Sequence, residues 1–388
     1  MAIYLDNSAT TRVRPEVLEA MLPYLGEHGG NPSSIHSSGR KAKEAVDKAR
    51  RQVSVLLNCE PDEVYFSPCG TVSNNVALLG RARFAEANGF GRHLVTTLIE
   101  HPAVLGPAKY LESRGWKVTF LPVDSQGTVR RDDFEAALTP ETSIASVMWA
   151  NNEIGTVEPV EEFARICSKR GIFFHTDAVQ VPGKLHLDMA QVPANSLALS
   201  GHKFYAPKGI GILFVRKLSN LMPIVFGGGQ EMGLMPGTES VASIVAIGEA
   251  AEIAHSNLLK TQEHLRKLQE ILWTKLSAVP DVKFTGATDM NRRLPGHVSL
   301  ILPEAKGESM VLNADIKGVC VSSGSACHNG IIEPSQVLKA VGLSNNEALG
   351  SLRISAGALT TEEECLSGAE ILSQILSSTK RKQSKSVH

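Results

Sequence analysis

The pattern of apolar and polar positions divides the chain into two regions. Between Glu63 and Val215, short runs of apolar, β-branched and aromatic residues alternate with longer segments of helical period. Near-continuous apolar strands separated by amphipathic helices are typical of a mostly parallel sheet covered on both faces. We expect its strands at Val64–Phe66, Leu94–Thr97, Val118–Leu121, Ile144–Met148, Ile172–Phe174, Ser196–Leu199 and Gly211–Val215, with helices that include Pro102–Ser113 and Val160–Lys169.

The pattern changes after about Ala242. A long helical stretch from Val241 to Ser277, with a break near Ser256, precedes shorter strands and further helices. The strands are expected at Val298–Ile301 and Leu352–Ile354, and the helices near Glu308–Asp315 and Thr361–Leu376. We predict an α/β protein with a large domain, 15–258, that holds a mostly parallel seven-stranded sheet. A smaller α+β domain is predicted from 1–14 and 259–378, followed by a basic tail, 379–388, that frays in solvent.

Composition and charge exclude several classes of protein. The 388 residues are 43% hydrophobic, enough for a large core, and their formal net charge is −1. A balanced charge argues against a nucleic-acid-binding surface or a polybasic membrane module. The first residues form no basic or apolar leader, and the longest apolar stretch, Val241 to Ala254, is too short to span a bilayer. We therefore expect a cytoplasmic protein with no nucleic-acid or membrane partner.

Polar residues follow two of the predicted strands, at the edge of the sheet where ligands bind in such folds. Lys203 closes the segment Ser200-Gly201-His202-Lys203, and a desolvated lysine at such a place can be a nucleophilic amine. Asp177, followed three residues later by Gln180, can pair with a cationic ring nitrogen. Taken alone, each residue also has an ordinary structural explanation: the lysine could lie in a surface turn, and the aspartate could be a helix N-cap.

Three more strand ends carry candidate residues. Gly70 and Thr71 open a helix whose exposed amides favour a phosphate. His101 can stack on an aromatic cofactor, and Asn152 can donate an amide hydrogen bond, although a cap or a turn is the ordinary explanation for either residue. All five strands belong to one sheet, so these residues are expected to converge. A lysine, an acid, a phosphate loop and a stacking histidine together match the needs of pyridoxal phosphate.

One cysteine out of six lies in a setting that an apolar core does not favour. Small and flexible residues surround Cys327 from Val321 to Gly330, which indicates a mobile surface loop with a reachable thiol, whereas Cys320 fits a buried strand. No Cys-x-x-Cys is present, so neither a redox pair nor a metal site is expected. Arg353, in a short apolar strand, suits bidentate capture of a carboxylate, with a structural ion pair as the alternative.

These motifs resemble the cysteine desulfurases of the class V aminotransferase family, which are pyridoxal phosphate enzymes of fold type I. The resemblance covers about 1–375 and is carried by Tyr4 to Thr11, Gly30 to Ser34, Asn151 to Gly155, Ser200 to Gly209, Gly227 to Glu231 and Ser322 to Cys327. The segment Ser322 to Cys327 is similar to that of the group with a long mobile cysteine loop. The resemblance implies conversion of L-cysteine to L-alanine, with the sulfur left as a persulfide for a sulfur-acceptor protein, as in iron–sulfur cluster assembly.

The resemblance also implies a role for each candidate residue. Lys203 would bind the cofactor covalently, Cys327 would accept the sulfur, and His101 would stack on the ring and assist proton transfer. The other cofactor-binding residues would be Asp177 at the ring nitrogen, Gln180 and Asn152 near the ring oxygen or substrate, and Gly70, Thr71, Ser200, Gly201 and His202 in the phosphate segments. Arg353, helped by Asn31, would bind the substrate carboxylate. Thr238 would reach the phosphate from a second subunit, so a homodimer is expected.

The chain departs from the family pattern beside the expected cofactor. Pro68, Cys69 and Val72 replace the usual residues around the phosphate loop, and Met232, Met235 and Ala358 replace common arginines. The lost positive charge leaves a sulfur-carrier or scaffold pseudoenzyme as one alternative. A selenocysteine lyase is another, because a histidine, His328, follows the reactive cysteine.

Overall fold

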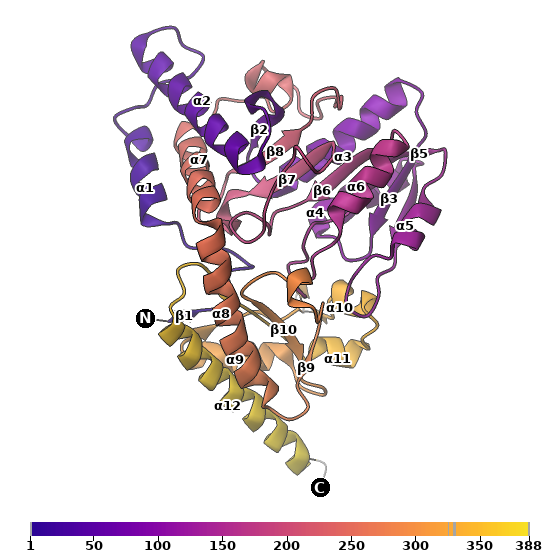
Figure 1. Ribbon diagram of the computed structural model, residues 1–388, viewed down its shortest axis with the longest axis vertical. Coiled ribbons are helices and arrows are strands. Elements are labelled where there is room, and N and C mark those ends of the chain that lie inside the picture. Colours follow the sequence, from indigo (N-terminus) through magenta and orange to yellow (C-terminus); the bar gives the residue numbers. More distant parts are fainter. Residues whose placement is uncertain (1, 325, 329–330, 387–388) are drawn as a thin grey trace.

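The computed structural model describes residues 2–324, 326–328 and 331–386 (Figure 1). Its largest sheet has seven strands in the order β2-β8-β7-β6-β5-β3-β4. They are β2 (Val64–Ser67), β3 (His93–Thr97), β4 (Lys117–Leu121), β5 (Thr142–Ser146), β6 (Phe173–Asp177), β7 (Ser196–Ser200) and β8 (Gly211–Val215). β8 is antiparallel to both neighbours, and the other pairs are parallel. The predicted seven-stranded, mostly parallel sheet is therefore confirmed.

Helices cover both faces of this sheet, because successive strand residues point to opposite sides. Leu94, Ile144 and Phe173 pack with α3 (Gly70–Ala87) and α4 (Pro102–Ser113) in one buried cluster. Their neighbours Val95, Ala145 and Phe174 belong to the larger cluster on the other side. The helices of that side are α1 (Pro15–Met21), α2 (Ser37–Leu57), α5 (Arg131–Ala137), α6 (Val160–Lys169) and the long α7 (Val241–Ser256).

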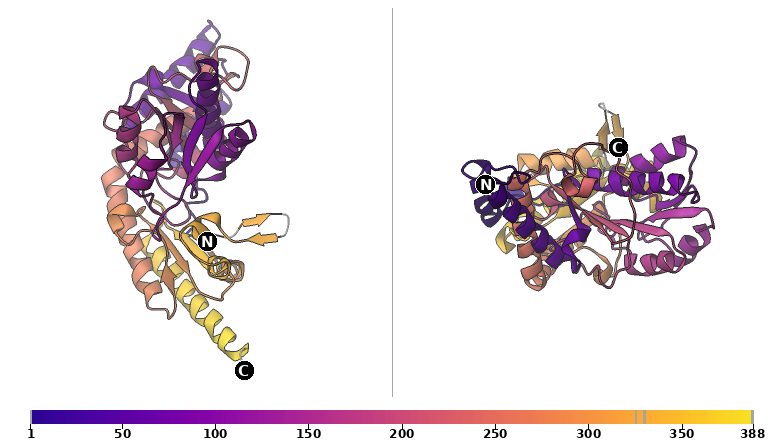
Figure 2. Two further views of the ribbon diagram at one scale, coloured as in Figure 1. Left: turned by 90° about the vertical axis from the view of Figure 1, so that its right-hand side faces the viewer. Right: turned by 90° about the horizontal axis from the view of Figure 1, so that it is seen from above.

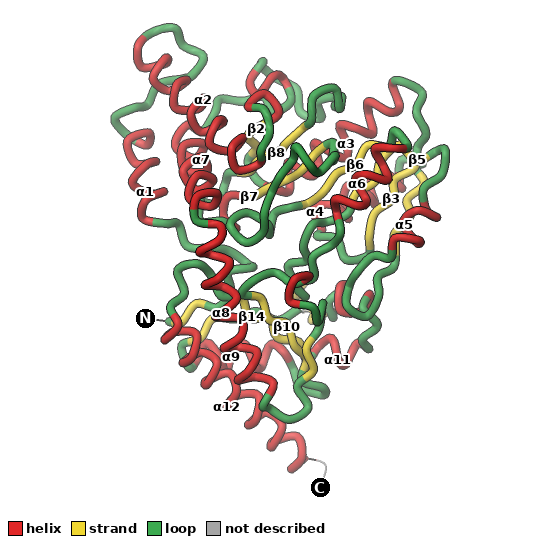
Figure 3. Tube along the Cα trace, in the orientation of Figure 1, coloured by secondary structure: helices red, strands yellow, loops and turns green. Residues whose placement is uncertain are grey.

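A second, smaller sheet lies below the first in Figure 3, where the strands form two separate groups. It has the order β14-β10-β9, all antiparallel, with β9 (Lys283–Phe284), β10 (His297–Ile301) and β14 (Ser351–Ser355). Its own apolar cluster includes residues of α8 (Leu258–Ser277), α9 (Gly307–Ile316) and α12 (Glu362–Ser386). α7 and α8 follow one another from the upper to the lower part of Figure 1, and the chain breaks between them at Asn257 as expected.

The N-terminal segment lies against this lower part. β1 (Ile3–Tyr4) pairs in parallel with β11 (Val319–Cys320), which places Cys320 in a strand as predicted, although its side chain is only half-buried. Two short helices, α10 (Gln336–Ala340) and α11 (Asn345–Leu349), precede β14. The division into domains at 15–258 and at 1–14 plus 259–378 stays a prediction.

Two expectations about irregular segments were wrong. The tail does not fray at 379, because α12 continues to Ser386, through residues such as Lys, Arg and Gln that have good helix propensity. The segment around Cys327 is not an irregular loop. It contains β12 (Ala326–His328), which pairs antiparallel with β13 (Ile331–Glu333), so that the backbone of Cys327 lies opposite Ile332. This hairpin projects from the rest of the chain in the left view of Figure 2.

Candidate active site

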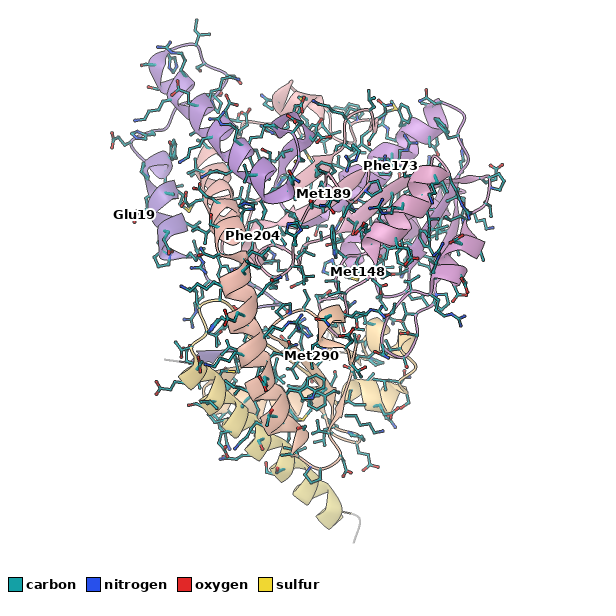
Figure 4. All side chains as sticks on the ribbon, viewed as in Figure 1. Glu19, Met148, Phe173, Met189, Phe204 and Met290 are labelled. Carbon is teal, nitrogen blue, oxygen red and sulfur yellow. The ribbon has the colours of Figure 1, made fainter. Side chains whose placement is uncertain are left out.

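Five strand ends meet at one cavity. β2, β3, β5, β6 and β7 run in the same direction, so their carboxyl ends lie on one edge of the sheet. The cavity at this edge has a volume of about 180 Å³. Its lining includes Met148, which Figure 4 labels at the lower edge of the large sheet. Nine predicted residues line it: Gly70, Thr71, His101, Asn152, Asp177, Gln180, Ser200, His202 and Lys203.

Lys203 is held at the wall of this cavity by the N-terminal segment. It ends a short 3₁₀ turn, Gly201–Lys203, directly after β7. Its Nζ donates to the carbonyls of Ser8 at 2.6 Å and Ala9 at 2.8 Å. Burial, together with the nearby charge of Arg353, lowers the pKa of Lys203 to about 8 against the opposing effects of Asp177 and Asp6. The amine is therefore far easier to deprotonate than a surface lysine.

A buried chain of hydrogen bonds fixes the orientation of the Asp177 carboxylate. Its Oδ1 accepts from the backbone amide of Val179 at 3.0 Å, and its Oδ2 accepts from Asn74 Nδ2 at 2.7 Å. Asn74 Oδ1 lies 2.8 Å from Nε2 of His175, whose Nδ1 lies 2.8 Å from the hydroxyl of Ser196. Burial lowers the pKa of His175 to about 3, so the ring is neutral. With Nε2 protonated, it orients the Asn74 amide to donate to Asp177.

The N-terminus of α3 opens into the same cavity without a side-chain cap. Cys69 occupies the N-cap position in extended backbone, and its side chain forms no capping hydrogen bond to the first amides of this 18-residue helix. A Cβ on Gly70 would lie 3.0 Å from Val179 Cγ2 and 3.2 Å from Ser200 Cβ, so a larger residue would require these two side chains to shift. Uncapped amides and the helix dipole together favour an anion.

Two histidines line the same cavity. His101 is the N-cap of α4 and accepts from the amide of Ala103 through Nδ1 at 3.1 Å, so its other ring nitrogen carries the proton when the ring is neutral. Desolvation against the cavity wall lowers the pKa of His101, Asp177 raises it and Lys203 lowers it. His202 lies 3.1 Å from the hydroxyl of Thr10 through Nδ1, and burial lowers its pKa to about 4.

Gln180 links the cavity to a buried lysine. Its Nε2 donates to the carbonyl of Ser8 at 3.0 Å, the same oxygen that accepts from Lys203. Its Oε1 accepts from Nζ of Lys184 at 3.2 Å. Burial, together with the charges of Lys203 and Arg353, lowers the pKa of Lys184 to about 7. Lys184 therefore fixes which end of the Gln180 amide faces the Ser8 carbonyl.

Arg353 lies beside the cavity rather than in its wall. It projects from β14 and donates through Nη1 to the carbonyl of Asn152 at 3.2 Å, and Asn152 lines the cavity. Its Nη2 forms an ion pair with Asp6 Oδ1 at 2.9 Å. Its Nε makes no hydrogen bond within the described part of the chain. The guanidinium thus keeps free donors next to the cavity.

Three other predicted residues lie outside the cavity lining. Gly201 is buried just behind it, where a Cβ would lie 2.8 Å from Ile210. Asn31 is exposed in the segment before α2, and its side chain accepts from the amide of Ser33. Thr238 is exposed and lines a different cavity, of about 470 Å³, whose wall also includes Pro68 and Val72 beside the start of α3.

Some of the positions that depart from the family pattern line this second cavity, and others do not. Val72 and Met235 line it. The side chain of Met232 is exposed instead, and its backbone has a positive φ of 55°. Ala358 donates its amide to the hydroxyl of Tyr205 at 2.5 Å. The backbone of Cys327 lies in the β12–β13 hairpin, and its side chain lies outside the described part of the structure.

Some residues of the site were missed by the sequence analysis. Asp6 and Ser8 bind predicted residues from far along the chain, and Lys184 binds Gln180 from four residues away. Asn74, in α3, binds Asp177, and His175, in the strand of Asp177, binds Asn74. Asn74 lies three residues after Thr71, which is the spacing of one helical turn and the one available signal. In the described residues no three His, Cys, Asp or Glu side chains gather as metal ligands. None of the helices described there has the length and apolar character needed to cross a membrane.

A mostly parallel sheet with a lysine, a buried carboxylate and an uncapped helix at its strand ends is the architecture of fold type I transferases that use pyridoxal phosphate. The chain belongs to the class-V aminotransferase family, whose model, Aminotransferase class-V, matches residues 3–366. The predicted family and fold class are thereby confirmed.

The chain is similar to individual members over almost its whole length. It is 44% identical over 375 residues to the cysteine desulfurase IscS of Clostridium botulinum (strain Kyoto / Type A2), covering 96% of this chain and 94% of that relative. A solved NifS-like protein aligns with a TM-score of 0.90 at 37% identity, over 97% of this chain and 100% of the other. A second structure, SspA in complex with cysteine, aligns with a TM-score of 0.79 at 33% identity, over 92% and 99%.

Proposed function

We propose that this protein is a pyridoxal-phosphate-dependent cysteine desulfurase. It converts L-cysteine to L-alanine and leaves the sulfur on Cys327 as a persulfide, for transfer to an acceptor protein such as one of iron–sulfur cluster assembly. The observation that carries the proposal is the meeting of Lys203, Asp177 and the N-terminus of α3 at one cavity. The similarity to cysteine desulfurases over nearly the full length gives the reaction.

The residues at the cavity fit pyridoxal phosphate. The amine of Lys203 suits its aldehyde, the carboxylate of Asp177 suits a protonated ring nitrogen, and the uncapped start of α3 suits its phosphate. Gly70, Thr71, Ser200, Gly201 and His202 would surround the phosphate, and His101 would stack on the ring. When bound, the cofactor supplies an electron sink for the carbon atoms of the substrate.

The chain's own groups then bind and orient the substrate. Arg353 holds the carboxylate through its free guanidinium donors, with Asn152 and Gln180 beside the cavity. Lys203, whose pKa is lowered to about 8, can accept and return a proton near neutral pH. His101 offers a second group for proton transfer.

Sulfur transfer requires the thiolate of Cys327. The thiolate attacks the sulfur of L-cysteine, a sulfur–sulfur bond forms and the carbon–sulfur bond breaks. The electron pair of the broken bond stays with the carbon, which takes up a proton and becomes the methyl group of L-alanine. L-cysteine and one thiol thus give L-alanine and one persulfide, with no external oxidant or reductant.

Replacing Arg353 with alanine should impair the use of L-cysteine far more than cofactor binding. Loss of the carboxylate contact is expected to cost ~2–4 kcal/mol, or ~30- to 1,000-fold in kcat/KM. Steady-state kinetics with cofactor content measured in parallel would test this role. Arg353→Lys is the matched variant, since it keeps the positive charge but loses the planar guanidinium that can donate two parallel hydrogen bonds to a carboxylate. Unchanged kcat/KM in the alanine variant would contradict the assignment.

The loading of the apoprotein should depend on pH through Lys203. With a pKa of about 8 the amine is neutral in about a tenth of molecules at pH 7, against about one in three thousand for an ordinary lysine. The rate of cofactor uptake should therefore rise up to pH ~8 and level off above it, since only the neutral amine is nucleophilic. Stopped-flow absorbance would measure this, with circular dichroism as the control for folding. A rate that climbs steadily to pH ~10 would contradict the lowered pKa.

The remaining sequence expectations belong to this proposal. In a homodimer, Thr238 of a second copy would reach the phosphate loop, and the position of Thr238 on a separate cavity of its own chain supports this. Asn31, which is exposed in its own chain, would help Arg353 to bind the substrate carboxylate. The cytoplasmic location stays a prediction.

The activity can be tested directly with purified protein, pyridoxal phosphate and a reductant. L-cysteine should yield L-alanine and sulfide in equal amounts. A protein that binds the cofactor yet forms no alanine would instead be a sulfur-carrier or scaffold pseudoenzyme. Faster turnover of selenocysteine than of cysteine would identify a selenocysteine lyase.

A further inference from the structure

One carboxylate joins the side chain of Arg353 to the segment that leads to Cys327. Asp6 Oδ1 accepts from Arg353 Nη2 at 2.9 Å, and Asp6 Oδ2 accepts from the hydroxyl of Ser322 at 2.8 Å. Both oxygens of Asp6 are therefore engaged, each with a different partner. The side chains of Arg353 and Asp6 are only 11% and 15% exposed, so the ion pair is largely sheltered from solvent and salt.

The backbone strengthens the same connection. Ser322 and Arg353 form an antiparallel bridge in which the amide of Arg353 donates to the carbonyl of Ser322 at 2.7 Å, and the amide of Ser322 donates back at 3.2 Å. Two residues later, the amide of Gly324 donates to the hydroxyl of Ser351, in the same strand as Arg353. The first strand of the hairpin begins at residue 326.

The far side of the hairpin is connected to the same region. After β13, the hydroxyl of Ser335 donates to Glu153 Oε2 at 2.5 Å. Glu153 follows Asn152, whose carbonyl accepts from Arg353 Nη1 at 3.2 Å. Both ends of the hairpin segment are thus bound by carboxylates that lie next to Arg353.

We infer that Asp6 is a positioning residue that couples carboxylate binding at Arg353 to the placement of the hairpin that carries Cys327. One oxygen of Asp6 orients the guanidinium, and the other holds Ser322 at the base of the hairpin. The inference rests on the proposed function, because it takes Arg353 as the site of the substrate carboxylate and Cys327 as the sulfur acceptor.

The coupling follows from the electrostatics of a shared guanidinium. A substrate carboxylate at Arg353 competes with Asp6 for the same positive charge, so the bond between Asp6 and Arg353 weakens when substrate binds. Asp6 then forms a stronger hydrogen bond with the hydroxyl of Ser322, whose backbone is paired with that of Arg353. Linkage makes this effect reciprocal: if the bound carboxylate strengthens the contact between Asp6 and Ser322, loss of that contact weakens binding of the carboxylate by the same factor.

The test uses L-alanine, which keeps the carboxylate of the substrate and lacks its sulfur. The holoenzyme is titrated with L-alanine by calorimetry, and the alkylation rate of Cys327 by iodoacetamide is followed by peptide mass spectrometry with and without L-alanine. The variants are Asp6→Asn, which keeps the shape but removes the charge, and Ser322→Ala, which cuts only the second contact. Asp132→Asn, an exposed change on α5, is the control.

L-alanine should change the alkylation rate of the parent protein about fivefold, a typical size for coupling between two sites. Asp6→Asn should tighten L-alanine binding about tenfold, because the substrate carboxylate no longer competes with a charged Asp6. It should also remove the alkylation response, because asparagine keeps only one acceptor oxygen for Arg353 and Ser322. Ser322→Ala should remove the same response while L-alanine binding falls by the coupling factor only. The control should behave as the parent.

Three results would overturn the inference: unchanged L-alanine affinity in Asp6→Asn, a full alkylation response in Ser322→Ala, or no response in the parent protein. Should Asp6→Asn fail to fold, as thermal melting would reveal, the Ser322→Ala arm decides alone. Failure of the proposed function is distinguished separately, because the parent protein would then form no L-alanine from L-cysteine.

Discussion

Replacing Lys203 with alanine should abolish covalent binding of pyridoxal phosphate and lower sulfur release by ~10³-fold or more. Its Nζ has two backbone acceptors at the cavity and a pKa lowered to about 8, so it is the described amine best placed to react with an aldehyde. Its loss removes two hydrogen bonds to Ser8 and Ala9 but no apolar core, so the fold should persist. Borohydride reduction of the loaded protein, followed by peptide mapping, measures the covalent link.

The chain offers a matched control for this experiment. Lys208 lies five residues further on and is exposed, so Lys208→Ala should keep the link and the activity. Lys184 is the stricter control, because it is buried near the cavity and its pKa is lowered to about 7. A pyridoxyl group found on Lys184, or on any lysine other than Lys203, would contradict the assignment.

Replacing Cys327 with serine should leave substrate binding intact and lower sulfur release by ~10³-fold or more, because a hydroxyl cannot form the persulfide. The cofactor and Arg353 do not depend on this side chain, so L-cysteine should still change the absorbance of the bound cofactor. Sulfide assay and absorbance titration on the same sample separate the two effects.

Cys320 provides the control for this second experiment. It lies in β11, paired with Tyr4, at the other end of the segment that leads into the hairpin. Cys320→Ser should therefore release sulfur at the parent rate. Full activity in Cys327→Ser would remove the central residue of the proposed mechanism.

The large sheet could be predicted from the sequence because each strand is an almost unbroken apolar run. All five residues of β6, Phe173 to Asp177, are buried, and so are all five of β8, Gly211 to Val215. The reversed direction of β8 could not be foreseen, since a strand buried on both faces looks the same in either direction. Once the sheet was assigned, residues at strand ends, such as Lys203 and Asp177, could be predicted to lie at the site.

What escaped prediction depends on contacts between distant segments. Asp6 meets Arg353 across 347 positions, and no spacing in the sequence indicates that pair. The hairpin at Cys327 was missed because Gly- and Ser-rich composition predicts an irregular loop, although Ile331 and Ile332 have high β propensity. His175 was missed because nothing in the sequence distinguishes a histidine that orients a neighbouring polar side chain from an ordinary core histidine in a strand.

The central claim is that sulfur from L-cysteine moves to Cys327. The most direct measurement is mass spectrometry of the holoenzyme after a single turnover with one equivalent of L-cysteine, without reductant, followed by peptide mapping. The account predicts one equivalent of L-alanine and a gain of ~32 Da, one sulfur atom, on the peptide that contains Cys327. A gain on the peptide of Cys69 or Cys320, or L-alanine formed with no sulfur on any cysteine, would contradict it.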